Sequence, residues 1–311
     1  MTASTQITDS TEAAVTSSEQ RNELIVVTGA STGMGAATAK ELARRGFQVL
    51  AGVRRDIDAD ALRADGIEPH ILDITVDADV AAIADRVERD PRPLRALINN
   101  AGIAINSPVE TLPLAQWRRQ FEVNLFGHIA ITQALLPALL RSSGTVANIS
   151  SVGGKVVLPT YGAYAGSKFA LEAASDALRR EVAALGVKVV VVEPGAVKTA
   201  MPERGIATAE ELTATLSAAQ LERYGRLNAA VTAQARSFIE TGVPAEQAAR
   251  VIARAATASR PRTRYTIGRD AAVLVRLSRV LPDRLLDRIV RRNLRSFADS
   301  APRPQRQLSR H

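Results

Sequence analysis

The stretch Leu24-Ile-Val-Val-Thr-Gly29-Ala-Ser-Thr-Gly33-Met-Gly35 joins a short apolar run to a glycine-rich turn. A helical pattern begins at its end and continues over residues 33–45. Glycine permits the tight turn and lets a pyrophosphate approach the backbone N–H groups at the positive end of a helix. The spacing Gly-x-x-x-Gly-x-Gly differs from the common Gly-x-Gly-x-x-Gly pattern, so a purely structural turn stays an alternative.

Short apolar runs alternate with longer helical patterns along most of the chain. Apolar runs without in/out alternation, separated by helices, indicate parallel strands that are covered on both faces. The fold class expected is therefore α/β: a Rossmann-type doubly wound parallel sheet of about seven strands with helices on both faces. The expected strands are 24–27, 47–51, 69–72, 94–98, 145–149, 187–192 and 264–267, and the helices between them are 33–45, 76–88, 114–140 and 161–185.

The composition predicts one domain with two tails. Residues 1–22 are rich in Thr, Ser, Ala and Glu without periodic apolar positions, which is typical of a disordered tail. Residues 23–269 form the expected single domain. Within it, a substrate flap is expected at about 200–240, with helices at 207–219 and 221–239. Residues 270–311 form a basic C-terminal extension with amphipathic patterns at 271–281 and 283–297.

Two arginines end the second expected strand, in the stretch Gly52-Val-Arg54-Arg55. An acidic residue at this position would accept hydrogen bonds from the ribose hydroxyls of NAD. Arginine instead pairs with a 2′-phosphate, so the sequence favours NADP as the cofactor and leaves NAD open. The alternative is a solvated arginine pair at a strand end.

Other candidate cofactor contacts also follow strands, where the ligand crevice of such a sheet lies. Asp73 suits a hydrogen bond to adenine, or alternatively caps the helix pattern at Val76. The stretches 99–102 and 194–199 close the fourth and sixth strands. The residues expected to bind the cofactor are Gly29, Ser31, Thr32, Gly33, Met34, Gly35, Arg54, Arg55, Asp73, Ile74, Asn100, Ala101, Gly102, Tyr164, Lys168, Pro194, Gly195, Val197 and Thr199.

A second stretch carries candidate acid–base chemistry. Tyr164 lies thirteen residues after Ser151, and Lys168 lies four residues after Tyr164. On a helix that begins near residue 161, Tyr164 and Lys168 lie one turn apart on the same face. A cation beside a phenol favours the phenolate, so we expect the pKa of Tyr164 to lie below its usual ~10. Tyr164 is then a proton donor and acceptor near neutral pH. A solvated Tyr/Lys pair is the alternative for this short pattern.

These residues in this order resemble the classical short-chain dehydrogenase/reductase family, over residues 23–200. The resemblance implies that Tyr164 is the catalytic acid/base and that Ser151 orients a carbonyl. It implies that Lys168 holds the nicotinamide ribose and lowers the pKa of the tyrosine. Asn124 would hold a water in a proton relay to Lys168.

Two neighbours of the catalytic residues lack the family spacing. Ser150 adjoins Ser151 but does not have the thirteen-residue offset, and Tyr161 has no lysine four residues later. The stretch Gly52–Arg55 and the long chain beyond Thr199 look similar to the steroid and retinol dehydrogenase-like branch.

Cysteine, histidine and charge exclude several function classes. The chain has no cysteine, which excludes disulfides, thiolate metal sites and Cys nucleophiles, and its three histidines are too scattered to predict a metal centre. A cytoplasmic setting fits this composition. The formal net charge is +8, and the sixteen arginines and four acids after position 249 give that segment +12. The rest of the chain is therefore slightly acidic, which argues against a nucleic-acid binder.

The apolar residues near Ser151 and the flap suggest a lipophilic substrate. Val152, residues 156–159 and Met201 are expected around the reacting group, although the valines suit a core equally well. In the segment 283–297, Leu285, Leu286, Ile289, Val290 and Phe297 share one broad face and the arginines lie elsewhere. Such a helix packs on its own domain or a partner subunit, or lies on an anionic membrane surface.

The function expected is an NADP-dependent oxidoreductase that interconverts an alcohol and a ketone or aldehyde, with a steroid-, retinoid- or lipid-like substrate. The hydride comes from the cofactor, and the protein supplies placement and proton management. One alternative is a redox sensor that binds NADP(H) without turnover, and another is a peripheral membrane module that uses the basic tail. We expect a homodimer or homotetramer, and at most weak membrane contact through the tail.

Overall fold

Strand β1 (Leu24–Val27) shows why the chain forms a sheet with two covered faces. All four of its side chains are buried. Ile25 and Val27 belong to the core on one face of the sheet, and Leu24 and Val26 belong to the core on the other. A strand with apolar side chains on both faces of the sheet is stable only when helices cover both faces. The computed structural model describes residues 22–278 and 280–298, so nearly all of the tail expected at 1–22 lies outside it.

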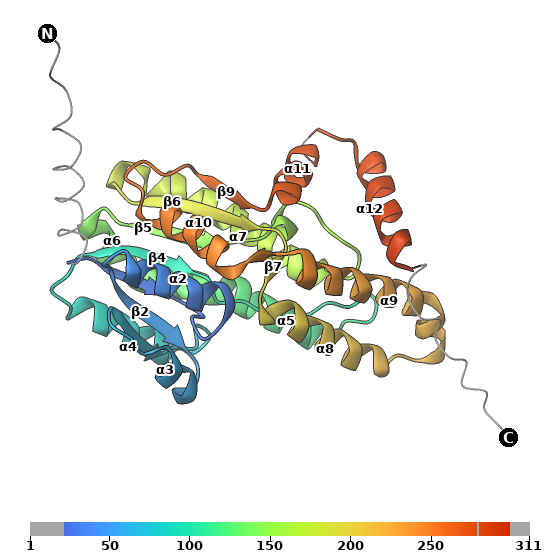
Figure 1. Ribbon diagram of the computed structural model, residues 1–311, viewed down its shortest axis with the longest axis horizontal. Helices are drawn as coiled ribbons and strands as arrows, with labels where there is room; N and C mark the ends of the chain where they lie inside the picture. Colours follow the sequence, from blue (N-terminus) through green and yellow to red (C-terminus); the bar gives the residue numbers. More distant parts are fainter. Residues whose placement is uncertain (1–21, 279, 299–311) are drawn as a thin grey trace, which may run out of the picture.

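The sheet has the doubly wound topology that the sequence predicts. Its seven strands are all parallel, in the order β3-β2-β1-β4-β5-β6-β9 (Figure 1). The strand order reverses between β1 and β4, which places the ligand crevice at their carboxyl ends. The other strands are β2 (Gln48–Val53), β3 (Ile67–Ile71), β4 (Leu94–Asn99), β5 (Thr145–Ile149), β6 (Lys188–Pro194) and β9 (Arg264–Ile267).

Helices cover both faces of this sheet. On one face, α2 (Gly33–Arg44) packs against α10 (Ala245–Thr257), and α3 (Asp56–Leu62) lies beside β2 and β3. On the other face lie α4 (Asp77–Glu88), α6 (Gly127–Ser142) and α7 (Gly162–Glu181). The short 3-10 turns 152–154 and 183–185 flank α7.

The structure adds two helices that the sequence analysis did not predict, α3 and α10. Helix α10 presents a buried face made mostly of alanines around Ile252. Alanine gives little hydrophobic contrast, so the periodicity of this helix is weak in sequence, although alanine is the best helix former. Its small side chains let α10 pack closely on α2 and the sheet.

The long helix expected at 114–140 is interrupted. Helix α5 (Leu114–Phe121) passes into a π-helical turn (Glu122–Phe126) and then into α6. By length and composition alone, the stretch Leu114–Ser142 could cross a membrane, but half of its most apolar window is buried inside the molecule. The π turn carries Asn124, and such single turns often occur where a side chain must be re-aimed at a functional site.

The segment after β6 forms a separate roof over the sheet. Helices α8 (Ala200–Ala214) and α9 (Ala218–Thr241) correspond to the expected flap. A two-stranded sheet of β7 (Val197–Lys198) and β8 (Val243–Pro244) ties both ends of this roof together. After β9, α11 (Arg269–Leu277) leads to α12 (Asp283–Ala298), which packs along α9 (Figure 1).

Candidate active site

One large cavity, of about 1320 Å³, opens at the carboxyl ends of the parallel strands and extends beneath the roof. Its walls come from the glycine-rich turn, the ends of β4, β5 and β6, and helices α7, α8, α9, α11 and α12. The structure therefore brings together residues that are far apart in sequence. The predicted residues that line the cavity are Met34, Asn100, Gly102, Ser151, Tyr164, Lys168, Pro194, Gly195, Val197 and Thr199.

The turn between β1 and α2 needs glycine because the backbone is crowded there. Gly29 and Gly33 both have positive φ, +63° and +58°. A Cβ on Gly29 would lie 2.7 Å from the Cα of Ala101, and one on Gly33 would lie 3.0 Å from the Thr199 side chain. A Cβ on Gly35 would lie 2.2 Å from the Gly29 carbonyl oxygen. The turn thus exposes backbone N–H groups at the start of α2, where an anionic phosphate group is stabilised.

Hydrogen bonds tie this turn to the end of β4. The Thr28 hydroxyl accepts hydrogen bonds from the backbone N–H groups of Asn100 and Ala101, both at 3.0 Å. The Asn100 amide in turn donates to the carbonyl oxygens of Thr28 and Gly29, also at 3.0 Å. The two strand ends on either side of the crevice are therefore held at a fixed separation.

The two arginines after β2 have different surroundings. Arg55 is engaged with Asp58 of α3 in an ion pair of 2.7 Å. Arg54 is exposed and, among the residues that the structure describes, has no ion-pair partner. A guanidinium without an acidic partner remains available for an anionic ligand, whereas Arg55 must first release Asp58.

Asp73 and Ile74 follow β3. The Asp73 carboxylate accepts hydrogen bonds from the backbone N–H and the hydroxyl of Thr75, at 3.0 and 2.7 Å. This local turn leads into α4, whose first residue has no side-chain cap. Asp73 therefore orders the loop at the crevice and does not cap the helix.

Ser151 and Tyr164, the predicted reactive pair, both line the cavity. Ser151 accepts a hydrogen bond from the backbone N–H of Gly153 at 3.0 Å, which fixes its side chain at the end of β5. Burial raises the pKa of Tyr164, and its hydrogen bond with Ser151 opposes this rise. The expectation that the pKa of Tyr164 lies below its usual ~10 is therefore wrong for this structure, because the cost of burying a phenolate outweighs the effect of the hydrogen bond with Ser151.

Lys168 is buried one turn after Tyr164 on the same helix. Its ammonium donates a hydrogen bond of 2.8 Å to the Ile149 carbonyl oxygen at the end of β5. Burial lowers the pKa of Lys168 to about 8, although nearby Glu172 favours the charged form. The structure thus places an ammonium that titrates close to neutral pH beside the reactive pair.

Asn124 lies in the π turn and contacts the loop after β4. Its Oδ1 accepts a hydrogen bond from the Ile103 N–H at 2.9 Å, and its Nδ2 donates to the Ile103 carbonyl at 3.0 Å. Nδ2 also lies 3.2 Å from the hydroxyl of Ser167 on α7. In this structure Asn124 positions the loop and α7, and the water relay implied for it stays a prediction.

Among the cavity residues that were not predicted as site residues are Tyr161, which was set aside because of its spacing, Gln234 and Asn293. Tyr161 lines the cavity and packs edge-on against Tyr164, with ring centroids 6.1 Å apart. Gln234 of α9 and Asn293 of α12 also line it. A polar glutamine on the apolar face of α9 is visible in the sequence and could have indicated a site residue. The position of Asn293 beside the cavity could not be predicted, because it depends on how α12 folds back onto α9.

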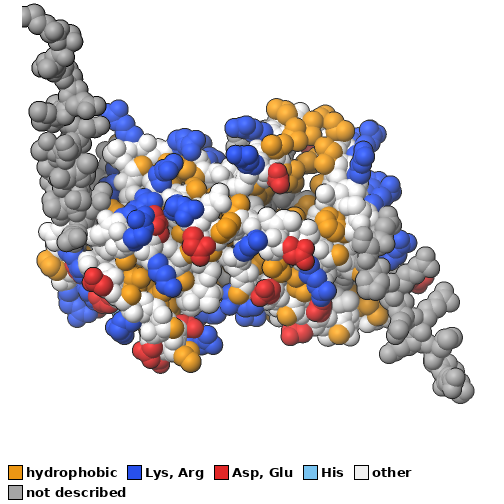
Figure 2. Space-filling model, in the orientation of Figure 1, with side chains coloured by type: hydrophobic (Ala, Val, Ile, Leu, Met, Phe, Trp, Pro, Cys, Tyr) orange, Lys and Arg blue, Asp and Glu red, His pale blue; other side chains and the backbone are white. Residues whose placement is uncertain are grey.

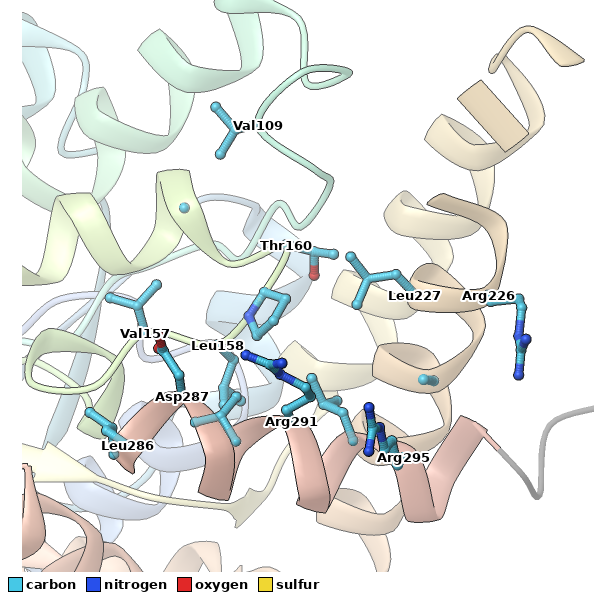
Figure 3. Close-up of a pocket in the computed structure, with 15 residues that line it drawn as sticks. Val109, Val157, Leu158, Thr160, Arg226, Leu227, Leu286, Asp287, Arg291 and Arg295 are labelled. Carbon is cyan, nitrogen blue, oxygen red and sulfur yellow. The ribbon is translucent and has the colours of Figure 1, made fainter. Parts of the chain in front are cut away.

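A second, smaller cavity of about 630 Å³ lies beside the first. Figure 3 shows Val157, Leu158 and Thr160 of the loop before α7 on one side, and Leu227 of α9 with the side chains of α12 on the other. Leu158 and Thr160 line both cavities and separate them. Val157 and Pro159, expected beside the reacting group, belong to this second cavity.

Comparison with known proteins yields a family and close relatives. The model of the family described as short chain dehydrogenase matches residues 23–210. Human retinol dehydrogenase 16 is 36% identical over 283 residues, covering 88% of this chain and 89% of that protein. The NADPH-dependent 3-dehydrocapnine reductase of Ornithobacterium rhinotracheale is 31% identical over 289 residues, covering 89% and 99%. A short chain dehydrogenase of Burkholderia cenocepacia, solved in complex with NADP, has a TM-score of 0.69 at 25% identity and covers 87% and 98%.

The buried ammonium of Lys168 should reduce the stability of the fold near neutral pH. The pKa of Lys168 is about 8 in the folded protein, and its usual value, 10.5, applies to the unfolded chain. Unfolding therefore takes up a proton between these two pH values. The destabilisation is complete below pH 8 and disappears as the pH rises towards 10.5. Lys168→Met should therefore raise the free energy of unfolding at pH 7 by about 1–3 kcal/mol, and the gain should shrink at pH 10.

Urea unfolding at both pH values measures this effect, with Lys40→Met as a surface control on α2. The control should change the free energy of unfolding by less than about 0.5 kcal/mol. A Lys168→Met protein that is less stable than wild type at pH 7 would contradict the prediction.

Proposed function

The chain belongs to the short chain dehydrogenase family, and on this premise we propose that it transfers hydride between NADP(H) and a lipophilic alcohol or its ketone or aldehyde. The observation that carries the proposal is the joint placement of Ser151, Tyr164 and Lys168 in one cavity with the glycine-rich turn. A sensor without turnover does not require all three groups. The redox-sensor alternative therefore has no observation in its favour.

The residues around the crevice suit a dinucleotide. The crowded glycines leave a backbone cradle for a pyrophosphate at the start of α2. Lys168 would hold the ribose, and Pro194, Gly195, Val197 and Thr199 line the same cavity. When bound, the cofactor supplies or accepts the hydride.

The chain's own groups manage the proton. In reduction, the Ser151 hydroxyl and the Tyr164 phenol hydrogen-bond the carbonyl oxygen, where negative charge develops. The raised pKa keeps Tyr164 protonated, so the phenol gives its proton to that oxygen as the hydride reaches carbon. Lys168, with its pKa of about 8, then helps to return a proton to Tyr164. Oxidation reverses these transfers.

NADP is preferred over NAD in this proposal because Arg54 is free to bind a 2′-phosphate. Arg54 makes no ion pair among the described residues, although its charge acts on nearby Asp58, which engages Arg55. Two relatives support the choice, since one is described as NADPH-dependent and one was solved with NADP. A lone guanidinium near the ribose attracts phosphate more strongly than it attracts a neutral hydroxyl.

A lipophilic substrate is proposed from the walls of the cavity. Beyond the reactive pair these are mostly apolar, and retinol dehydrogenase 16 is among the relatives. A steroid-, retinoid- or lipid-like alcohol has the apolar surface that such walls bury. The apolar side chains that line this part are Ile103, Val152, Val156, Leu158, Met201, Ile206, Val231, Phe238, Leu274 and Ile289.

Weak contact with an anionic membrane is proposed for the surface between α11 and α12. Figure 2 shows an apolar patch there with Lys and Arg side chains beside it. Val273, Leu277, Val280, Leu285 and Ile289 are exposed in this region. Apolar side chains beside arginines suit the boundary between lipid headgroups and acyl chains.

We also propose a cytoplasmic location and a homodimer or homotetramer. Leu114, Phe126 and Phe169 are exposed apolar side chains on neighbouring helices, and such side chains suit contact with a partner copy. Light scattering on the purified protein tests the assembly, and cell fractionation tests the location.

Tyr164→Phe should abolish most turnover while leaving cofactor affinity nearly intact, because it removes the proton but little contact surface. A loss of about 10²–10⁴-fold in kcat is expected. Turnover is followed by NADPH absorbance with a panel of lipophilic ketones, and cofactor affinity by fluorescence titration. Tyr265→Phe is the matched control, since Tyr265 is buried but lies outside the cavity. Equal kcat for wild type and Tyr164→Phe would refute the acid–base assignment.

Arg54→Asp should move cofactor preference towards NADH. The carboxylate repels a 2′-phosphate and accepts hydrogen bonds from a free ribose hydroxyl. The ratio of kcat/KM for NADPH to that for NADH should fall by at least about tenfold, which corresponds to ~1.4 kcal/mol. Arg89→Asp, at an exposed position after α4, is the control. An unchanged ratio would identify Arg54 as a solvated strand-end residue and direct attention to Arg55.

Deleting residues 283–311 should lower the melting temperature, because α12 covers part of α9 and buries Leu294. The full chain should co-sediment with vesicles that contain phosphatidylglycerol, less so as salt rises, because salt screens the arginines. The truncated chain should lose this binding. Equal sedimentation of the full chain with neutral and anionic vesicles would contradict the membrane contact, and an unchanged melting temperature would contradict the packing role.

A further inference from the structure

Gln234 is a buried polar residue in an otherwise apolar part of α9. It is 3% exposed, and its buried neighbours on the same helix face are Ala230, Val231 and Ala235. It also lines the large cavity, on the roof that covers the reactive pair. Burial of an amide among alanines and a valine is costly unless both ends of the amide find partners.

Only one end of this amide has a partner. Its Nε2 donates a hydrogen bond of 2.5 Å to Oδ1 of Asn293 on α12. Its Oε1 is buried and has no hydrogen-bond partner within the described part of the chain. Turning the amide around would exchange the unpaired oxygen for an unpaired NH₂ group, so the deficit persists in either orientation. An unmet buried group of this kind disfavours the empty state and favours a ligand that supplies the missing partner.

A purely structural role accounts for half of this arrangement. The bond between Gln234 and Asn293 joins α9 to α12 and helps to close the cavity. This interhelical hydrogen bond uses only the Nε2 atom of Gln234. It does not explain why the Oε1 atom is buried without a partner. Three further buried oxygens in the same cavity also have no partner in the described residues: Asn106 Oδ1, Ser150 Oγ and Thr160 Oγ1. The cavity thus offers hydrogen-bonding positions that no group in the described residues takes up.

We propose that Gln234 is a specificity-determining residue that hydrogen-bonds a hydroxyl group of the substrate remote from the carbon that is oxidised or reduced. The substrate class is then a lipophilic alcohol or ketone that carries a second oxygen function. This inference rests on the proposed function and narrows it. Asn293 orients Gln234 from α12, and Thr160 and Asn106 provide additional acceptors for an oxygenated ligand.

The test uses matched ketones with the full-length protein and NADPH. One pair is a saturated steroid ketone with and without a hydroxyl on the ring farthest from the ketone. The other is a series of long-chain methyl ketones with and without a terminal hydroxyl. Wild type should favour at least one hydroxylated member by about 10–100-fold in kcat/KM. Gln234→Leu should bring that ratio close to unity, mainly by lowering kcat/KM for the hydroxylated ketone.

Two further variants separate specificity from packing. Asn293→Leu breaks the bond between the helices but keeps Gln234, so most of the hydroxyl preference should remain. Gln220→Leu changes an amide on the same helix that does not line the cavity and accepts a hydrogen bond from the Ser217 N–H at 3.0 Å, so it should keep the preference as well. Melting temperatures measured on all variants verify that each one is folded.

The outcomes are distinguishable. Turnover of the ketones by wild type without any hydroxyl preference would overturn the inference and leave the proposed function standing. Equal loss of preference in Gln234→Leu and Asn293→Leu would also overturn it, because the effect would then belong to the interhelical bond. No turnover of any ketone, or of the matching alcohols with NADP, would overturn the proposed function itself.

Discussion

The site depends on the close approach of two backbone segments at the point where the strand order of the sheet reverses. Gly29 and Gly35 allow the turn after β1 to lie against the end of β4, and Thr28 and Asn100 lock it there by reciprocal hydrogen bonds. Because β1 and β4 are adjacent in the sheet while their helices leave on opposite faces, a crevice must open above them. Bulkier residues at these glycines would separate the strand ends and remove the backbone cradle.

The positions of Ser151 and Tyr164 depend in turn on a network of polar and charged side chains on and beside α7. Lys168 donates to the Ile149 carbonyl, and Glu172, one turn further along, favours its charged form. Glu172 is itself paired with Lys155 at 2.7 Å and with Arg264 of β9 at 3.0 Å. Strand β9 therefore contributes to the site in two ways, because Thr266 and Ile267 line the cavity and Arg264 pairs with the carboxylate that lies near the lysine. Because Glu172 pairs with both Lys155 and Arg264, this carboxylate keeps one cationic partner when the other is removed.

The features that could be predicted from the sequence are those that depend on local periodicity and on the order of the strands. Seven apolar runs correspond to the seven parallel strands, and β9 has the expected bounds. Helix α10 was missed because alanine gives weak hydrophobic contrast, and the π turn at Asn124 was missed because a single extra residue leaves no trace in a periodic pattern. The pKa of Tyr164 was predicted in the wrong direction. The sequence shows which cation is near, but the depth of burial is set by tertiary packing.

The substrate end of the cavity was the hardest part to predict from the sequence, because part of it is formed by α12, which folds back onto the domain after the last strand. Helix α12 has enough arginine to suggest a solvated or membrane-bound helix, yet it also buries Leu294 and lines the cavity with Asn293. The charged side of α12 thus faces solvent. Its other side completes a cavity whose other lining residues come earlier in the sequence. Because the walls near Ser151 and Tyr164 serve the proposed proton chemistry, we expect differences in substrate choice to arise in the roof of α8 and α9 and in α12. A polar side chain there, such as Gln234, can discriminate between substrates without disturbing the chemistry, because it acts on a part of the ligand that does not react.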